Sequence, residues 1–420
     1  MRKILIICDT FPPESDVGGL RPAMFSKYLP EFGFEPIIFT RTRPKDDPDY
    51  RPTHLLDGLP RPDKIVRVEF GAQAQAGFLR QRSPWTALRH FFHTEEGHPA
   101  GAYQAMRSAF DRLSPHTFDI VLGTAPSLFP IRLASEIAAM RGIPWVADFR
   151  DIAEQSEPVS ETFRERLVIR RHIWRRNGLT RSAAAVLTVS QRHVQMLTRA
   201  MGNNVHLLYN GFDHQLFVPQ PPVRTERLNL TYVGRILTTD LQAVDILFSA
   251  LDLLIERGQI DPSKMEVLFV GAEGSILGPS ISGRKCREMV RLRDRILYQK
   301  TPELMRDSNA LLVVTNPLQK GMLTTKLFEY MGMHRSVLSV PGDGDELDEL
   351  IRRTKCGWSC PDVPTTAQAL LDIYHQWERT GWVAFEGDHD EIRKFSRREQ
   401  ARQLAEICRA ILVSTAKEGR

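Results

Sequence analysis

Residues 119–146 read DIVLGTAPSLFPIRLASEIAAMRGIPWV. A short apolar run follows Asp119, a stretch of helical length covers residues 128–140, and a second apolar run begins after Gly142. A glycine in that place commonly ends a helix, because it adopts a left-handed backbone conformation at no steric cost. Strand, helix and strand of these lengths predict a β-α-β unit, the connection that joins two parallel strands.

The same alternation continues in both directions along the chain. Several of the apolar runs are apolar on both faces, as in parallel strands that helices cover on each side. In the first half the predicted strands are residues 4–8, 36–40, 65–70, 120–124, 144–149, 184–190 and 205–209, with a further helix at 21–32. In the second half they are residues 228–233, 267–270, 295–298, 311–315 and 336–340. Two such series of about equal length predict an α/β protein with two doubly wound, Rossmann-like domains.

A polar, proline-rich stretch at residues 219–226 is the best candidate for a linker. We therefore expect an N-terminal domain at 1–212, a linker at 213–226, a C-terminal domain at 227–390 and a helix at 391–420. The tail from residue 390 to 416 reads as one charged helix with apolar positions along it. Residues 43–62 are dense in proline, aspartate and arginine, and we expect a mobile loop there.

Composition excludes several classes of protein. Of 420 residues, 42% are hydrophobic and 25% charged, which is typical of a soluble globular protein. The net charge of +5 is too small to indicate nucleic-acid binding without a concentrated basic face. The five cysteines lack zinc-site spacing, and only four apolar residues precede Cys8, too few for a signal peptide. We expect a cytoplasmic protein with reduced thiols and no membrane span.

Ligands of doubly wound sheets bind beyond the carboxyl ends of the strands, so the loops there are the place to look. Gly18 and Gly19 follow the first strand and open a helix, where backbone N–H groups can approach a phosphate. The alternative is a simple turn that begins the helix. Neither a G-x-G-x-x-G nor a G-x-x-x-x-G-K-[ST] motif is present, which disfavours a nicotinamide cofactor and a P-loop.

Asp148, Arg150 and Asp151 place three charges at the end of the strand 144–149. Charges in this position are candidates for a functional role. The alternative is an Asp–Arg pair that stabilises the loop.

In the second half, Gly234 and Arg235 end the strand 228–233, and an arginine there can bind two phosphate oxygens. Residues 320–330 read KGMLTTKLFEY and enter a helix. Thr324 and Thr325 can cap that helix, Lys326 can bind a phosphate, and Glu329 lies on the same side, where it can bind sugar hydroxyls. The alternative is a capped surface helix with an ion pair between Lys326 and Glu329.

Two Asp-x-Asp triplets, at residues 343–345 and 388–390, raise the question of a divalent metal. Both lie at the beginning of predicted helices, where carboxylates are favoured by the helix dipole alone. We expect helix starts there, with no metal and no cofactor.

The order and spacing of these pieces resemble the retaining glycosyltransferases of family 4 (group 1), in the branch that builds bacterial surface polysaccharides. The matching motifs are Pro12-Pro13 with Gly18-Gly19 and Arg21, residues 142–151, Val189-Ser190, residues 210–213, residues 232–235, residues 269–271 and the KLFEY run at 326–330.

The resemblance implies the GT-B architecture, with two domains facing a central cleft and a C-terminal helix that crosses back to the N-terminal domain. It implies that a nucleoside-diphosphate sugar is bound and that no metal is needed. The implied donor-binding residues are Gly18, Gly19, Arg21, Gly234, Arg235, Gln299, Lys300, Gly321, Thr324, Thr325, Lys326 and Glu329. Among them Arg235 and Lys326 bind the diphosphate, Glu329 the ribose, and backbone atoms around Gln299 the base. Asp148, Arg150 and Asp151 would orient the acceptor hydroxyl.

The sequence departs from the family pattern in two places. Gly321 stands where the first glutamate of a Glu-x7-Glu signature is usual, and no lysine follows Arg235 within residues 236–240. Lys320 or Arg284 could replace the missing charge in part.

The function expected is transfer of a sugar, with retention of configuration, from a UDP-sugar to a sugar, a lipid-linked sugar or a small-molecule acceptor. Two other functions remain open. One is a UDP-sugar 2-epimerase of the same architecture, and the other is a nucleotide-sugar-binding assembly protein whose catalytic centre has decayed, which Gly321 suggests.

One more feature concerns partners. Seven arginines lie in a predicted helix around residues 163–181, with Phe163, Leu167 and Trp174 on one side and further apolar residues spread around it. Such a helix can lie on the inner face of the cytoplasmic membrane. The alternative is a partly buried helix with a solvated arginine face.

Overall fold

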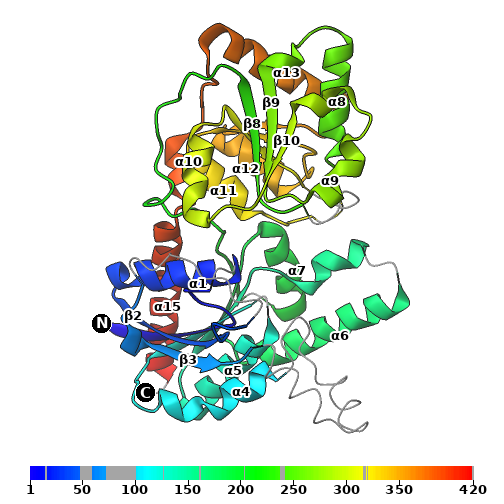
Figure 1. The fold of residues 1–420 in the computed structure, drawn as a ribbon. Helices are drawn as coiled ribbons and strands as arrows, with labels where there is room; N and C mark the ends of the chain where they lie inside the picture. Colours follow the sequence, from blue (N-terminus) through cyan, green and yellow to red (C-terminus); the bar gives the residue numbers. More distant parts are fainter. Residues whose placement is uncertain are drawn as a thin grey trace. The chain divides into compact units, whose positions relative to one another are not determined.

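The computed structural model describes residues 1–14, 17–47, 59–71, 101–125, 127–159, 162–202, 204–236, 242–315, 318 and 320–418. The chain forms two compact units (Figure 1). Unit 1 comprises Met1–Tyr209 and Arg397–Arg420, and unit 2 comprises Asn210–Ser396. The proline-rich stretch belongs to unit 2, where the Trp377 indole N–H donates to the Thr225 hydroxyl at 3.0 Å.

Unit 1 is built on a parallel sheet of seven strands in the order β3-β2-β1-β4-β5-β6-β7. The strands are β1 (Arg2–Cys8), β2 (Phe34–Thr42), β3 (Ile65–Glu69), β4 (Ile120–Thr124), β5 (Trp145–Phe149), β6 (Ala185–Thr188) and β7 (Val205–Leu207). All seven strands predicted for this half of the chain are confirmed. The segment 43–62 lies partly outside the described residues.

Helices lie on both faces of this sheet, as expected for parallel strands. They are α1 (Val17–Tyr28), α4 (Ala102–Ser108), α5 (Leu128–Arg141), α6 (Phe163–Thr180), α7 (Gln191–Met201) and α15 (Arg397–Glu418), with 3-10 turns η1 (Leu29–Phe32), η2 (Pro62–Lys64), η3 (Phe110–Leu113) and η4 (Ala153–Val159). Leu5 and Ile7 join the core that α4 and α5 cover. The predicted β-α-β unit is confirmed as β4-α5-β5, and Gly142 ends α5 in a left-handed conformation at φ 64°.

The C-terminal tail returns to unit 1, as predicted. Helix α15 packs against α1 and η1, and Arg398 reaches the Glu31 carboxylate at 2.6 Å. The prediction of one continuous tail helix is wrong, because a short helix α14 (His389–Arg393) ends before α15 begins. Between them Phe395 is buried against Phe328, with ring centroids 5.3 Å apart, so this residue belongs to the core of unit 2.

Unit 2 contains a parallel sheet of six strands in the order β10-β9-β8-β11-β12-β13. The strands are β8 (Leu228–Val233), β9 (Met265–Val270), β10 (Val290–Arg293), β11 (Ala310–Val313), β12 (Ser336–Ser339) and β13 (Gly357–Ser359). Four predicted strands are confirmed, but the strand placed at 295–298 is wrong, since β10 lies earlier in the chain. β10 alternates arginine with apolar residues at the sheet edge, and β13 is only three residues long, so neither has the apolar run used for prediction.

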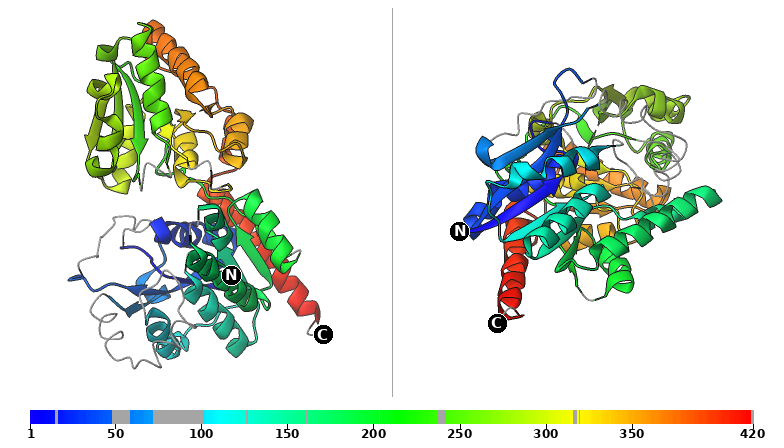
Figure 2. Two further views of the ribbon diagram at one scale, coloured as in Figure 1. Left: turned by 90° about the vertical axis from the view of Figure 1, so that its right-hand side faces the viewer. Right: turned by 90° about the horizontal axis from the view of Figure 1, so that it is seen from below.

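The helices of unit 2 also cover both sheet faces. They are α8 (Asp245–Glu256), α9 (Gly274–Ile281), α10 (Thr301–Arg306), α11 (Thr325–Gly332), α12 (Glu346–Thr354), α13 (Val363–Thr380) and α14, with 3-10 turns η5 (Pro262–Lys264), η6 (Lys285–Met289) and η7 (Tyr298–Lys300). Helices α8 and α13 pack against each other on one face, as both views show (Figures 1 and 2). Across the described ranges, no helix is long and apolar enough to cross a membrane.

Both sheets share a strand order in which the third, second, first, fourth, fifth and sixth strands follow one another. This is the doubly wound order, and its direction reverses between the first and the fourth strand. The expected binding positions are therefore the carboxyl ends of β1 and β4 in unit 1 and of β8 and β11 in unit 2.

Candidate functional site

The end of β8 and the start of α11 meet at the reversal point of unit 2. Gly234 has φ 141°, a conformation that side chains rarely adopt. A Cβ atom built on Gly234 would overlap the Lys326 Cε and lie 2.8 Å from its Nζ. The Lys326 side chain therefore lies directly across the Gly234 backbone, and the glycine is required for this approach. Two residues predicted for the donor site are thus brought into contact.

Two cations lie at this point, and neither has a carboxylate partner among the described residues. Lys326 is half-buried and has its ammonium 5.4 Å from the Tyr232 ring centroid, while Arg235 is exposed. Within the described residues neither side chain forms an ion pair, so the predicted alternative of a Lys326–Glu329 pair is wrong. Positive charge that no acid neutralises is what an anionic ligand needs.

Two tyrosines shape the loop that carries Arg235. The Tyr330 hydroxyl accepts the Val233 N–H at 3.1 Å, and the Tyr232 hydroxyl donates to the Arg235 carbonyl at 3.0 Å. Both side chains are buried, and burial raises the pKa of Tyr330 well above its ordinary value, so the phenol stays neutral. The sequence analysis assigned no role to these tyrosines, because the loop they hold is formed by residues far apart in the chain.

Helix α11 begins where the sequence predicts. The Thr324 hydroxyl accepts the Lys326 N–H at 3.4 Å and caps the helix. Thr325 is the first residue of the helix and is half-buried. Gly321 has φ 75° and is buried in the preceding loop. The amino end of α11 adds positive potential beside Lys326 and Arg235.

Glu329 lies one turn along α11 and is 6% exposed. One carboxylate oxygen accepts the Tyr298 hydroxyl at 2.8 Å. Tyr298 begins the turn η7 and packs edge-on against Phe217, at 5.7 Å between ring centroids. The segment predicted to hold a base, which includes Gln299, is therefore tied to the predicted ribose residue. Lys300 points elsewhere, to an exposed ion pair with Glu303 at 3.0 Å.

In unit 1, Arg21 and Asp148 form a buried pair. Their side chains are 1% and 0% exposed, and the guanidinium binds both carboxylate oxygens at 3.0 and 2.9 Å. Arg21 also donates to the Leu208 and Tyr209 carbonyls, each at 2.9 Å. With this burial, the geometry favours a framework role for both residues, in line with the Asp–Arg alternative, over the direct ligand contacts expected of them.

Arg150 and the two glycines lie together at the end of β1. Arg150 donates to the Ala125 carbonyl at 2.6 Å and to the Gly18 carbonyl at 2.8 Å, so it holds the first turn of α1. A Cβ atom on Gly19 would lie 3.1 Å from the Thr10 carbonyl, which shows how closely this turn packs on the loop. Asp151 is exposed, and the Gln155 amide donates to its carboxylate at 3.4 Å.

His193 is a buried residue of unit 1 that the sequence analysis missed. It is 1% exposed, its Nε2 has no hydrogen-bond partner in the described part of the chain, and burial lowers its pKa to about 4. Asp151 and Glu154 carry charges that act on this ring in the opposite direction. His193 lies three residues after the N-cap Ser190, and nothing in the sequence indicated its burial, because a histidine in the first turn is compatible with any helix start.

The two acidic triplets are helix starts, as predicted. Asp343 is buried and accepts the N–H groups of Asp345, Leu347 and Asp348 at 2.9 to 3.2 Å, and burial raises the pKa of its carboxyl group. Asp388 accepts two N–H groups at the start of α14. Their oxygens serve the backbone, and the described residues contain no cluster of three metal-ligating side chains.

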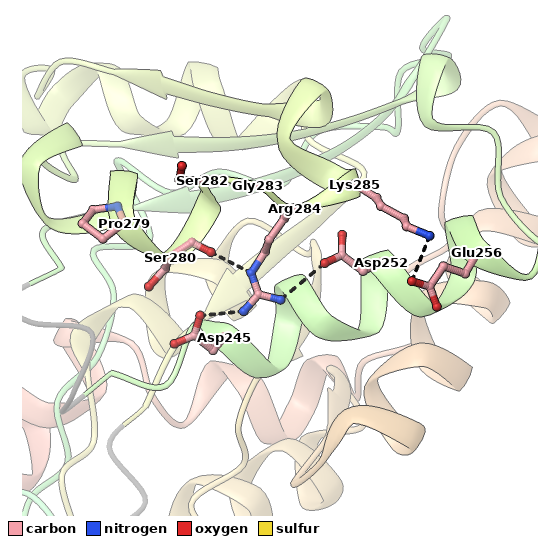
Figure 3. A pocket seen from close by; sticks show the side chains of 9 residues that line it. All are labelled: Asp245, Asp252, Glu256, Pro279, Ser280, Ser282, Gly283, Arg284 and Lys285. Carbon is pink, nitrogen blue, oxygen red and sulfur yellow. Dashed lines mark hydrogen bonds and ion pairs between the residues drawn. The ribbon is translucent and has the colours of Figure 1, made fainter.

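The two cations suggested as replacements for the missing lysine both contact other groups of unit 2, and for Arg284 these include two carboxylates. Lys320 donates to the Asp343 carbonyl. Arg284 lies in an open polar pocket of about 590 Å³ between α8 and the end of α9 (Figure 3). There it binds Asp245 at 2.8 Å, Asp252 at 3.4 Å and the Ser280 carbonyl at 2.6 Å. Residues 237–240 lie outside the described residues.

Comparison with known proteins gives a family and a fold. The family model of the glycosyl transferases group 1 matches residues 227–376, which lie within unit 2. No curated protein sequence matches significantly. Among solved structures, a sucrose-phosphate synthase from Thermosynechococcus elongatus superimposes with a TM-score of 0.67 at 14% identity, covering 99% of this chain and 100% of that one.

Two other solved structures superimpose over nearly their whole length. HepE from Anabaena, in complex with UDP and glucose, has a TM-score of 0.63 at 15% identity over 98% of this chain and 100% of its own. WaaG, a glycosyltransferase involved in lipopolysaccharide biosynthesis, has 0.56 at 14% identity over 96% and 95%. At these identities the likeness shows the fold of both units, and the family match adds the class of unit 2.

Proposed function

We propose that this chain, whose residues 227–376 match the glycosyl transferases group 1 and whose two units have the GT-B fold, transfers a sugar from a UDP-sugar to an acceptor hydroxyl with retention of configuration. The observation that carries this proposal is the pair of cations at the reversal point of unit 2. Lys326 lies across Gly234 beside the amino end of α11, and Arg235 is exposed next to it. A diphosphate is the ligand that this arrangement suits best.

The reaction breaks the bond between the anomeric carbon and the donor phosphate oxygen, and forms a bond from that carbon to the acceptor oxygen. The acceptor proton passes to the leaving phosphate oxygen. Negative charge grows on the diphosphate in the transition state, where Lys326, Arg235 and the N–H groups that open α11 stabilise it. One preorganised electrostatic donor of this kind contributes about 2 to 4 kcal/mol. In this proposal no metal is needed, since fixed cations neutralise the leaving group.

We assign the nucleoside to the Glu329 region. The Glu329 carboxylate would accept the ribose hydroxyls, with the Tyr298 hydroxyl holding it in place at 2.8 Å. Backbone atoms of Gln299 and Lys300 would bind the base, and Gly321, Thr324 and Thr325 would line the donor. Uracil is the base proposed, in keeping with HepE, whose structure contains UDP and glucose.

Acceptor binding is proposed for unit 1. Asp151 is exposed at the end of β5, and Arg150 positions the turn of Gly18 and Gly19, whose N–H groups would approach the donor. The buried pair of Arg21 and Asp148 would hold α1, the end of β5 and the chain after β7 in place. WaaG is described as acting in lipopolysaccharide biosynthesis, and we propose a comparable task here: bacterial polysaccharide or glycoconjugate synthesis in the cytoplasm, at its membrane, with a sugar, a lipid-linked sugar or a small molecule as the acceptor.

The test is a panel of nucleotides and UDP-sugars in a thermal-shift assay, followed by product analysis. A bound donor raises the unfolding temperature by mass action, and Lys326→Ala should lose most of that shift. Slow release of free sugar, or transfer to an added acceptor, supports the transferase. Formation of the C2 epimer would indicate the epimerase, and binding without turnover would indicate an assembly protein. No shift with any nucleotide would refute the donor site.

A further inference from the structure

Helix α6 has two apolar faces, and the inner face packs against other elements of unit 1. Val168, Ile169 and Ile173 are half-buried where α6 contacts α5, α7 and η4. Near its C-terminal end, the buried Arg176 binds both Glu154 carboxylate oxygens at 2.6 Å. The helix is thus fixed to unit 1 along this side.

The outer face carries large apolar side chains in water. Phe163, Leu167 and Trp174 are 81%, 53% and 75% exposed, and we refer to these three residues as the apolar stripe. At 3.6 residues per turn, their spacing of four and then seven residues places them within an arc of about 40°. Aligned exposure of this kind marks an interaction surface, whereas single exposed apolar residues do not. The alternative of a partly buried helix with a solvated arginine face therefore does not explain the exposed apolar side chains of α6.

Arginines flank the stripe on both sides. By the same helical geometry, the exposed Arg166 and Arg170 lie along one flank and the exposed Arg164 along the other, where Arg171 and Arg175 are half-buried. Glu165 is the single acid in the helix, and its carboxylate caps the helix start by accepting the Thr162 N–H at 3.0 Å. Figures 1 and 2 show the N-terminal half of α6 extending beyond α5 and α7, in agreement with the exposure of Phe163 and Leu167.

We propose that the apolar stripe docks unit 1 on an anionic lipid bilayer. Aromatic rings and leucine would enter the boundary between headgroups and acyl chains, and the flanking guanidinium groups would meet lipid phosphates. A second copy of the chain is a poor partner for the stripe. A two-fold contact would place the arginines of one copy opposite those of the other, and these like charges would repel. This inference rests on the membrane location given under the proposed function and assigns it to α6, and its test is independent of the donor site in unit 2.

Vesicle sedimentation tests the surface without any measurement of activity. Wild-type protein should bind vesicles of equal parts phosphatidylglycerol and phosphatidylcholine, and bind pure phosphatidylcholine weakly. The double variant F163E/W174E should lower the partition coefficient on anionic vesicles by about tenfold or more, because both anchors lose their apolar contribution. The variant R166A/R170A should weaken binding to anionic vesicles and leave binding to neutral vesicles unchanged.

The matched control is M140E/V413E, which replaces two exposed apolar residues on α5 and α15, 63% and 56% exposed, and changes the net charge by the same amount. It should bind as wild type does. UDP binding to unit 2, measured by calorimetry, should be unchanged in all three double variants, which would show that each of them is folded. A second readout uses Trp174→Phe, which keeps a large aromatic side chain in the stripe. Brominated lipids should quench the tryptophan fluorescence of the wild-type protein, and this quenching should be smaller in Trp174→Phe.

Three results would overturn the proposal. The first is absence of wild-type binding to the anionic vesicles. The second is equal partition of wild type and F163E/W174E. The third is a dimer, detected by light scattering, that F163E/W174E dissociates while vesicles bind neither protein, which would assign the stripe to self-association.

Discussion

Replacing Gly234 with alanine tests the contact on which the donor site depends. The added Cβ would overlap the Lys326 Cε and lie 2.8 Å from Nζ, so the lysine side chain must leave its position. The backbone at φ 141° is also unfavourable for alanine, at a cost of about 1 to 3 kcal/mol in folding free energy. Stability and donor affinity should therefore both fall, for separate reasons.

The functional part of this loss should equal the loss caused by removing the lysine itself. Lys326→Ala alone should reduce kcat/KM by about 2 to 4 kcal/mol, or roughly 30-fold to 1000-fold. If Gly234→Ala acts by displacing Lys326, the double variant should be no worse than Lys326→Ala, within about 0.5 kcal/mol. The coupling free energy should then be about as large as the single effect.

The assays are urea unfolding for stability and calorimetry with UDP for affinity, completed by kinetics once a donor is known. Gly258→Ala is the matched control, since Gly258 also has a positive φ of 63° but nothing lies within 4 Å of its Cβ position. It should lose stability and keep UDP affinity. Additive losses in the Gly234 and Lys326 double variant would refute the reasoning, because they would mean that the two residues act independently.

The other predictions concern the nucleoside, the metal and pH. Glu329→Gln should raise the Kd for UDP and reduce the preference for UDP over its 2′-deoxy analogue in calorimetry, while Tyr298→Phe, which removes only the supporting hydroxyl, should have a smaller effect. An unchanged ratio in Glu329→Gln would leave Glu329 as a structural residue. Transfer should persist in EDTA, and activity that EDTA abolishes and magnesium restores would contradict a metal-free site. Burial lowers the pKa of His193 to about 4 from 6.5, so the unfolded chain takes up this proton first as the pH falls, and stability should drop by up to about 3 kcal/mol between those values. His193→Gln should remove that part of the pH dependence in urea unfolding, and an unchanged slope would show that another group causes it.

The sheets could be predicted because their central strands are continuous apolar runs. The two edge strands of the sheet in unit 2 could not, since β10 alternates arginine with apolar residues and β13 has only three residues. The break between α14 and α15 was missed for a similar reason. A charged, periodic tail hides the fact that Phe395 turns into the core of unit 2.

In the candidate site, residue types were predictable and their surroundings were not. Arg21 and Asp148 have the charge expected of ligand-binding residues, but whether a charge at a strand end faces water or a buried partner depends on the packing of distant segments. The contact between Gly234 and Lys326 likewise joins the end of β8 to the start of α11, which only the fold brings together. The hydroxyls of Tyr232 and Tyr330 support that contact by hydrogen bonds to the Arg235 carbonyl and the Val233 N–H. Such bonds to the backbone do not depend on residue type, so the sequence does not reveal them.

In the sequence, Gly321 in place of a signature glutamate suggested a decayed catalytic centre. The structure gives another reason for this glycine. Gly321 is buried at φ 75°, where a glutamate would be strained, so the loop is built around the glycine. Two other buried cations have partners for their charge or their N–H groups: Arg176 binds Glu154, and Arg335 donates to backbone carbonyls. Lys326, by contrast, places its charge near the positive end of α11, an arrangement that costs stability until an anion binds. A site that had lost its ligand would gain by losing that charge. Its retention, with Gly234 opened to receive it, favours a working donor site over a decayed one.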